Sequence, residues 1–127
     1  MTRINAGIPP AELSDKHLLA EHREIKRIPN MVKSGKAKVE NIPDTFTLGK
    51  GHVKFFYNKL GYLFHRYQRV YNECLKRGFN VTNYTEAWDH NGDQAFLDLC
   101  NGWVATPEAA KLIKERIAER NASSSST

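Results

Sequence analysis

A long amphipathic segment between residues 52 and 77 constrains the fold of this chain more than any other feature. Apolar side chains recur there at intervals of three and four, which places them on one face of an α-helix. Gly78 follows, a residue type that commonly ends helices in the left-handed conformation. We predict one helix from His52 to about Arg77 that buries a broad apolar face. That face comprises Val53, Phe56, Tyr57, Leu60, Leu63, Phe64, Tyr67, Val70, Tyr71, Cys74 and Leu75.

Two further helices are expected, one on each side of this segment. The first begins at Ser14, a residue type favoured at helix N-caps, and runs to about Arg27, where Pro29 is expected to stop it. The other opens with Thr106-Pro107-Glu108, which combines a capping hydroxyl with proline at the first helical position. Because no stretch alternates convincingly as a strand would, we predict an all-α fold with three principal helices and irregular connections.

The length of 127 residues suits one compact domain, which we place at residues 1–120. Residues 121–127 are rich in serine and are expected to form a disordered tail. The chain contains no apolar run of the roughly 20 residues that span a bilayer, and its start lacks the apolar stretch of a secretory signal. We therefore expect a monomeric cytoplasmic protein, bacterial or of a phage acting in its host, with Cys74 and Cys100 reduced.

Charge is unevenly distributed along the chain, whose formal net charge is +5. Residues 50–78 contain seven basic side chains and one acidic one, whereas residues 79–110 contain five acidic side chains and none that is basic. This pattern predicts a polarised surface, and nucleic acid is the commonest partner of a basic face. The alternative interpretation is a basic helix that is merely solvated through its own charges.

Two short sequence patterns give only weak evidence for a ligand-binding site. Gly49-Lys50-Gly51-His52 is too short for a phosphate-binding P-loop and is better explained as the turn that starts a helix, although its backbone amides could hold a DNA phosphate. His17 and Glu21 have the spacing of two metal ligands on a helix, but no further histidine or cysteine cluster accompanies them. We therefore expect no metal site and no cofactor.

The N-terminus offers a different kind of chemistry. A methionine followed by a small residue such as Thr2 is normally removed in the cytoplasm, which exposes the Thr2 α-amino group. Such amines have a pKa of about 7.7–8.0, far below that of lysine, so that an appreciable fraction is free base at neutral pH. A free amine can attack a carbonyl-like carbon and form an imine. Arg3 lies beside it and could hold a phosphate.

Several segments, taken in order, give the chain a specific resemblance. They are Met1-Thr2-Arg3-Ile4-Asn5, the stretch HLLAEHREIKRIP at residues 17–29, LGKGHV at 48–53, FFY at 55–57 with Lys59-Leu60, and ECLKRGFN at 73–80. In these segments the chain resembles the endonuclease V-like family of pyrimidine-dimer DNA glycosylases. The likeness is strong over about residues 1–80 and weak in the third helix.

The resemblance implies a single all-α domain that acts on double-stranded DNA containing pyrimidine dimers or abasic sites. It implies removal of the 5′ base of the dimer, followed by cleavage of the backbone at the abasic site (lyase activity). The nucleophile falls on the Thr2 amine and the key carboxylate on Glu24. The DNA-binding side chains fall on Arg3, Lys16, His17, Arg23, Arg27 and Arg116.

Three other functions stay open at this level. The chain could be a non-catalytic basic DNA-binding module with the same fold, which retention of Met1 would favour. It could be an abasic-site lyase with altered lesion preference, since His22 and the Ser-rich tail depart from the family pattern. It could be a metal-dependent nuclease that uses His17, Glu21 and Glu24.

Overall fold

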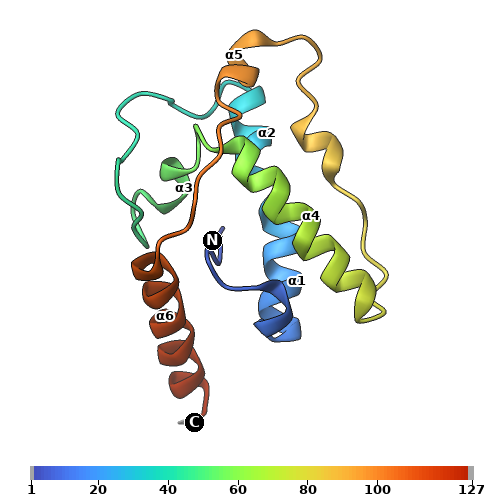
Figure 1. Ribbon diagram of the computed structural model, residues 1–127, viewed down its shortest axis with the longest axis vertical. Coiled ribbons are helices and arrows are strands. Elements are labelled where there is room, and N and C mark those ends of the chain that lie inside the picture. The colour runs from blue at the N-terminus through green and yellow to red at the C-terminus, as the bar shows by residue number, and fades with distance from the viewer. Residues whose placement is uncertain (1, 126–127) are drawn as a thin grey trace.

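The computed structural model describes residues 2–125, with side chains through Glu119, and this part of the chain contains helices and no strand. The fold is all-α, as predicted (Figure 1). No described helix is long and apolar enough to cross a bilayer. In chain order the elements are η1 (Pro10–Glu12), α1 (Asp15–Glu24), α2 (Arg27–Lys33), α3 (His52–Phe55), α4 (Leu60–Lys76), η2 (Thr85–Trp88), α5 (Gln94–Asp98) and α6 (Pro107–Ser125).

Helices α1 and α4 pack against each other and form the centre of the molecule (Figure 1). Ser14 caps α1 as predicted, because its side chain accepts a hydrogen bond from the backbone N–H of His17. Leu18 and Ile25 are fully buried on the α1 side, and Leu63 and Val70 on the α4 side. Apolar side chains of the two helices therefore meet in one core.

The first predicted helix is two helices. The helical hydrogen-bond ladder is interrupted between α1 and α2, although Ile25 and Lys26 keep right-handed helical dihedrals. Helix α2 then continues to Lys33, so the expectation that Pro29 ends the helix is wrong. Proline has no N–H to donate to Ile25, four residues earlier, and its ring would clash with that carbonyl in a continuous helix. A break before Pro29 removes both problems, because the proline then lies in the first turn of α2.

The long helix predicted from His52 to Arg77 is also interrupted. Helix α3 ends at Phe55 and α4 begins at Leu60, with Lys59 in a non-helical conformation between them. Phe55, Phe56 and Tyr57 are all buried, and three consecutive side chains cannot all lie on one face of a straight helix. The break turns all three aromatic rings into the core. At its C-terminal end α4 stops before Gly78, which has a φ of 83°, as predicted.

The segment that follows α5 covers the start of α4. The N–H of Leu60 donates to the carbonyl of Leu99 at 3.0 Å, and the N–H of Tyr62 to the carbonyl of Asn101 at 3.1 Å. Gly61 permits this approach, since a Cβ there would lie 2.8 Å from the carbonyl oxygen of Cys100. These bonds satisfy two of the amide donors that the first turn of α4 leaves free.

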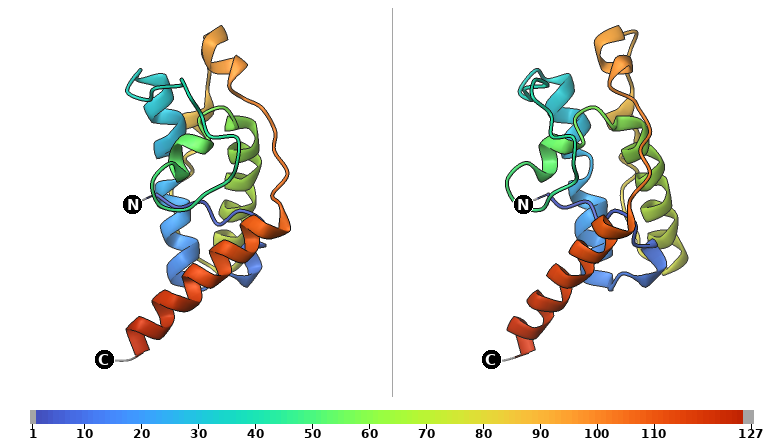
Figure 2. Two further views of the ribbon diagram at one scale, coloured as in Figure 1. Left: turned by 90° about the vertical axis from the view of Figure 1, so that its left-hand side faces the viewer. Right: turned by 60° about the vertical axis from the view of Figure 1, so that its left-hand side comes forward.

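Helix α6 extends away from the α1–α4 pair (Figures 1 and 2). Thr106 caps it through a 3.1 Å bond from the N–H of Ala109, and Ala109 and Ile113 are buried. The helix backbone continues to Ser125, into the predicted tail. Residues 126 and 127 and the side chains beyond residue 119 lie outside the described part, so the disorder of residues 121–127 stays a prediction.

The basic segment 50–78 contributes less positive surface than its charge count suggests. Arg66 is buried and pairs with Glu21, while Arg77 pairs with Glu73 and Asp15. Arg77 also donates to the carbonyls of Pro10, Ala11 and Leu13 and so ties the start of the chain to the end of α4. Both arginines serve the fold, because their charges are matched by carboxylates within the protein.

Candidate active site

The N-terminal segment is held against α1 by a buried ionic network. Asn5 donates from its side-chain Nδ2 to Glu21 Oε1 at 2.8 Å. Arg66 binds both oxygens of the same carboxylate, at 2.7 Å and 2.8 Å, and also donates to the backbone carbonyl of Ile8. Glu21 and Arg66 are both almost fully buried. The network therefore fixes residues 5–8 between α1 and α4.

A second anchor holds the same segment from the opposite side. The backbone N–H of Ile4 donates to Nε2 of His52, the first residue of α3, at 2.9 Å. Nδ1 of that ring lies 2.8 Å from the carbonyl oxygen of Thr47. Burial lowers the pKa of His52, and the nearby positive charge of Arg3 lowers it further. The histidine is therefore a neutral side chain in this position.

Thr2, the predicted nucleophile, is buried at 9% exposure, directly before these two anchors. Arg3 is partly exposed, and its charge acts on His52. The chain start lies beside α1, close to α3, in each view (Figures 1 and 2). The segment that carries the predicted nucleophile is therefore a fixed part of the fold.

Glu24 lies at the end of α1, between two arginines. Its carboxylate is 3.4 Å from Arg23 and 3.8 Å from Arg27, and its side chain is 13% exposed. The arginine side chains are 62% and 52% exposed, so each retains donors that face solvent. Exposed ion pairs of this kind stabilise a protein little. A carboxylate flanked by two accessible cations is better suited to a phosphate-bearing ligand than to holding the helix together.

The other predicted DNA-binding residues are spread over two helices. Lys16 is exposed in the first turn of α1, and His17 Nδ1 lies 2.8 Å from the hydroxyl of Ser14. Arg116 is on α6, where it pairs with Glu119 at 3.6 Å. The structure thus brings Arg23, Glu24 and Arg27 together. It places Lys16 and His17 at the other end of α1.

The trio considered as metal ligands is not brought together. Glu21 faces the core, and both of its oxygens are bound to Arg66. His17 bonds with Ser14 near the start of α1, while Glu24 lies with the two arginines at its end. Among the described residues, no group of three histidine, cysteine or acidic side chains has the arrangement of a metal site.

His22, where the sequence departs from the pattern of the family that it resembles, lies in a buried aromatic cluster. Its ring centroid is 5.4 Å from that of Tyr67, 6.1 Å from Tyr71 and 5.2 Å from Tyr84. The Tyr67 hydroxyl lies 3.0 Å from Nε2 of His22 and accepts a 2.8 Å bond from the Tyr84 N–H. Burial lowers the pKa of His22 and raises that of Tyr67 to about 12. His22 therefore joins α1, α4 and the segment before η2.

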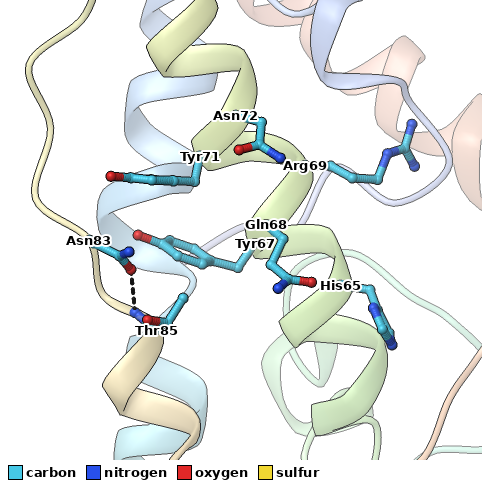
Figure 3. Close-up of a pocket in the computed structure, with 8 residues that line it drawn as sticks. All are labelled: His65, Tyr67, Gln68, Arg69, Tyr71, Asn72, Asn83 and Thr85. Carbon is cyan, nitrogen blue, oxygen red and sulfur yellow. Dashed lines mark hydrogen bonds between the residues drawn. The ribbon is translucent and has the colours of Figure 1, made fainter.

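A surface cavity of about 550 Å³ lies beside this cluster (Figure 3). Residues of α4 from His65 to Asn72 form one wall, and Asn83 and Thr85 form the other. Asn83 accepts a 2.9 Å bond from the Thr85 N–H, which shapes that second wall. None of the predicted site residues lines the cavity. The chemistry is therefore better located from the charged groups on α1 than from this hollow.

Sequence reasoning missed the residues that hold the N-terminus in place. Asn5 and Glu21 are 16 positions apart, and Ile4 and His52 are 48 apart, so no local periodicity connects them. One signal was present in the Gly49-Lys50-Gly51-His52 turn, which was interpreted as a helix start whose amides could hold a phosphate and not as a contact for the N-terminus. Gly51 has a φ of 91°, which turns the chain so that His52 enters the core.

Comparison with known families gives a match over the first two thirds of the chain. The model of a family described as pyrimidine dimer DNA glycosylase matches residues 1–87. This range contains the N-terminal segment, α1 with Arg23, α2 with Arg27, and the whole of α3 and α4. It ends before α5 and α6, and so before Arg116.

Proposed function

Because the chain belongs to the pyrimidine dimer DNA glycosylase family, we propose that it excises a base from dimer-containing DNA with the Thr2 α-amine and then cleaves the strand at the abasic site. Membership places the protein in DNA repair and makes DNA with pyrimidine dimers its substrate class. The mechanism and the residue roles are our proposal.

The double anchoring of the N-terminal segment supports this proposal most strongly. A nucleophile at a chain end must be held, since termini are usually mobile. Here Asn5, which is three positions after Thr2, donates a hydrogen bond to Glu21. Glu21 is in turn about one helical turn from Glu24 on α1. Three residues extend at most about 10 Å, and side chains one turn apart have Cβ atoms about 5–6 Å apart. These contacts attach the segment that carries Thr2 to the part of α1 that carries Glu24, which supports the proposal that the two residues share one site.

The proposed first step is attack on the sugar. The neutral Thr2 amine uses its lone pair to bond to C1′ of the 5′ nucleotide of the dimer, and the bond between C1′ and the base breaks. The base leaves with the electron pair and takes up a proton. Glu24 stabilises the positive charge that develops on the sugar, because a carboxylate is favourable beside such a cation.

The second step cuts the backbone. The nitrogen lone pair forms a protonated imine with C1′ as the C1′–O4′ bond of the sugar ring breaks, and O4′ keeps the electron pair of that bond and takes up a proton. This imine acidifies the proton on C2′. A base removes that proton, and the electrons form the C2′–C3′ double bond as the 3′ phosphate leaves. Glu24 is suited to moving this proton, a role that contributes about 10²–10⁴ in rate in other enzymes. No metal or cofactor enters the scheme.

The arginines are proposed to position the damaged strand. Arg23 and Arg27 present accessible guanidinium groups on both sides of Glu24, and Arg3 follows the nucleophile. Guanidinium groups bind phosphate oxygens in bidentate fashion and independently of base sequence. Lys16, His17 and Arg116 are proposed as outer contacts, of which Arg116 has the least support because the family match ends before it.

Borohydride trapping tests the proposal. Borohydride reduces an imine to a stable amine, so protein incubated with an abasic-site duplex should become covalently joined to the DNA. Protein acetylated at its N-terminus should form no adduct and should still bind the duplex. Efficient strand cleavage without any reducible intermediate would contradict the proposal. Measurement of the intact mass shows whether Met1 is absent, and its retention would favour the non-catalytic binding module.

A further inference from the structure

His52 makes two hydrogen bonds that fix its chemical state. The Ile4 amide can only donate, so Nε2 of His52 must present a lone pair. The proton of the neutral ring is then on Nδ1, where it donates to the carbonyl of Thr47. A protonated imidazolium would direct an N–H at the Ile4 N–H, and the bond would be lost.

The surroundings keep this ring neutral and immobile. Its side chain is 3% exposed, and the rings of Phe46 and Phe56 contact it edge to face, each with its centroid 5.4 Å away. Two charged groups act on it: Arg3, on the N-terminal segment, disfavours the imidazolium, and Glu21, on α1, favours it. Arg66 on α4 binds Glu21 and so offsets part of its influence. Burial is the largest effect, and it holds the pKa of His52 below its ordinary value of 6.5.

Building on the proposed role of the Thr2 amine, we propose that His52 is a positioning residue for it: by accepting a hydrogen bond from the Ile4 N–H, the neutral ring fixes the orientation of residues 2 and 3 within the fold. His52 does not touch the reacting atoms in this scheme. Only two residues separate its hydrogen bond from the nucleophilic nitrogen, so a turn of the Ile4 peptide moves that nitrogen directly. A displacement of about 1 Å in a reacting group can cost about 10²-fold in rate.

Two substitutions separate the hydrogen bond from the packing. His52→Phe keeps an aromatic ring between Phe46 and Phe56 and removes the acceptor. His52→Gln places an amide oxygen near the position of Nε2, where it can accept from Ile4, and cannot titrate. An exposed histidine of α4 gives the matched control, His65→Gln.

The first readout is the rate of adduct formation under single-turnover conditions, with enzyme saturating over abasic-site duplex and borohydride as the trap. We expect His52→Phe to slow trapping by about tenfold or more while its Kd for the duplex stays within about twofold. His52→Gln should recover most of the native rate. Equal rates for the native protein and His52→Phe would overturn the proposal, as would a His52→Gln protein that is as slow as His52→Phe.

The second readout is the pH profile, which a purely structural role would not change. Both the native protein and His52→Gln lose rate toward acid as the Thr2 amine takes up a proton. Only the native protein has a second group whose protonation breaks the bond to Ile4. The ratio of native to His52→Gln trapping rates should therefore be constant above pH 6.5 and fall below the pKa of His52. A ratio that stays constant across the pH range in which NMR shows His52 of the native protein to titrate, with both proteins folded by circular dichroism, would overturn the proposal.

Failure of this inference and failure of the proposed function are distinguishable. If the native protein forms no reducible adduct, the proposed chemistry is wrong. If it forms one and the variants behave like the native protein, only the role of His52 is wrong. Should His52→Phe not fold, the comparison of the native protein with His52→Gln across pH still decides the question.

Discussion

Two glutamates on α1, three positions apart, have different surroundings. Glu21 is buried and binds Arg66, Asn5 and thereby the start of the chain. Glu24 is partly exposed, and it is next to two arginines that are themselves accessible. A buried carboxylate with every oxygen paired is committed to structure, whereas the accessible one can meet a ligand. Substitution by glutamine should accordingly affect the reaction rate at Glu24 and the stability of the fold at Glu21.

We expect Glu24→Gln to fold and bind abasic-site DNA normally but to lose about 10²–10⁴ in single-turnover rate, since it removes the proton-transferring group. Glu21→Gln should instead lower the free energy of unfolding by about 3–5 kcal/mol, because it leaves the buried charge of Arg66 unpaired. Rate assays and urea denaturation of both variants check this. A Glu24→Gln protein with a near-native rate would remove Glu24 from the mechanism.

If the arginines beside Glu24 contact phosphates, they should contribute to the salt dependence of DNA binding. Each phosphate contact contributes about 0.9 to the slope of log Kobs against log salt concentration. Arg23→Ala and Arg27→Ala should each lower the steepness of that slope by about 1. Lys38→Ala, an exposed change outside the predicted contact set, serves as the control. Unchanged slopes in both arginine variants would exclude phosphate contacts at these positions.

Among the elements, those whose ends are set by local chemistry were predictable. Ser14, Gly78 and Thr106 mark helix ends in the sequence and do so in the structure. The interruption before Leu60 was not predictable, because it depends on a bond from that residue to Leu99 and on the burial of three consecutive aromatic rings. Periodicity alone describes an uninterrupted helix equally well.

The contact between the N-terminal segment and α6 depends on one glycine. Gly7 has a φ of 79°, and a Cβ there would lie 2.9 Å from Cβ of Ala110 on α6. Gly35 has nearly the same φ, 77°, but nothing within 4 Å, so it is a matched control.

Alanine at Gly35 should cost about 1–2 kcal/mol of stability for left-handed strain alone. Alanine at Gly7 should cost distinctly more, because α6 must also move. Urea denaturation of both variants measures the two losses. Equal losses would show that the packing of Gly7 against α6 contributes nothing.

Over the whole molecule, the all-α class and the family could be predicted from the sequence, whereas the hydrogen bonds and ion pairs that connect the residues of the site could not. Thr2 was named from the chemistry of an exposed terminal amine together with a likeness to known enzymes, and Glu24 from that likeness alone. The side chains that hold the N-terminal segment, Asn5, Glu21 and His52, act through contacts between distant parts of the chain. The charge count of residues 50–78 also overstated their positive surface, because Arg66 and Arg77 form ion pairs with carboxylates within the fold.

Two buried histidines should make the stability of the whole molecule depend on pH. The pKa values of His22 and His52 are lowered in the folded state, mainly by burial, from about 6.5 in the unfolded chain. Below pH 6.5 the unfolded chain therefore binds more protons, and stability falls as the pH falls toward the folded values. Each histidine contributes up to about 1.4 kcal/mol per pH unit in that window and nothing above it.

Guanidinium denaturation between pH 5.5 and 7.5 checks this expectation. His22→Phe, which keeps a ring in the tyrosine cluster and cannot titrate, should weaken the pH dependence by about half. His65→Gln should leave it unchanged. Stability that is level or rises from pH 6.5 to 5.5 would contradict the prediction.

The identity of the atom that bonds to the DNA tests the central claim most directly. The reduced adduct formed with abasic-site DNA can be digested with protease and nuclease, and the modified peptide sequenced by mass spectrometry. We predict that the sugar remnant is on the α-nitrogen of Thr2, in a peptide that begins at that residue. A remnant on a lysine side chain, or on a peptide that still begins with Met1, would contradict the mechanism.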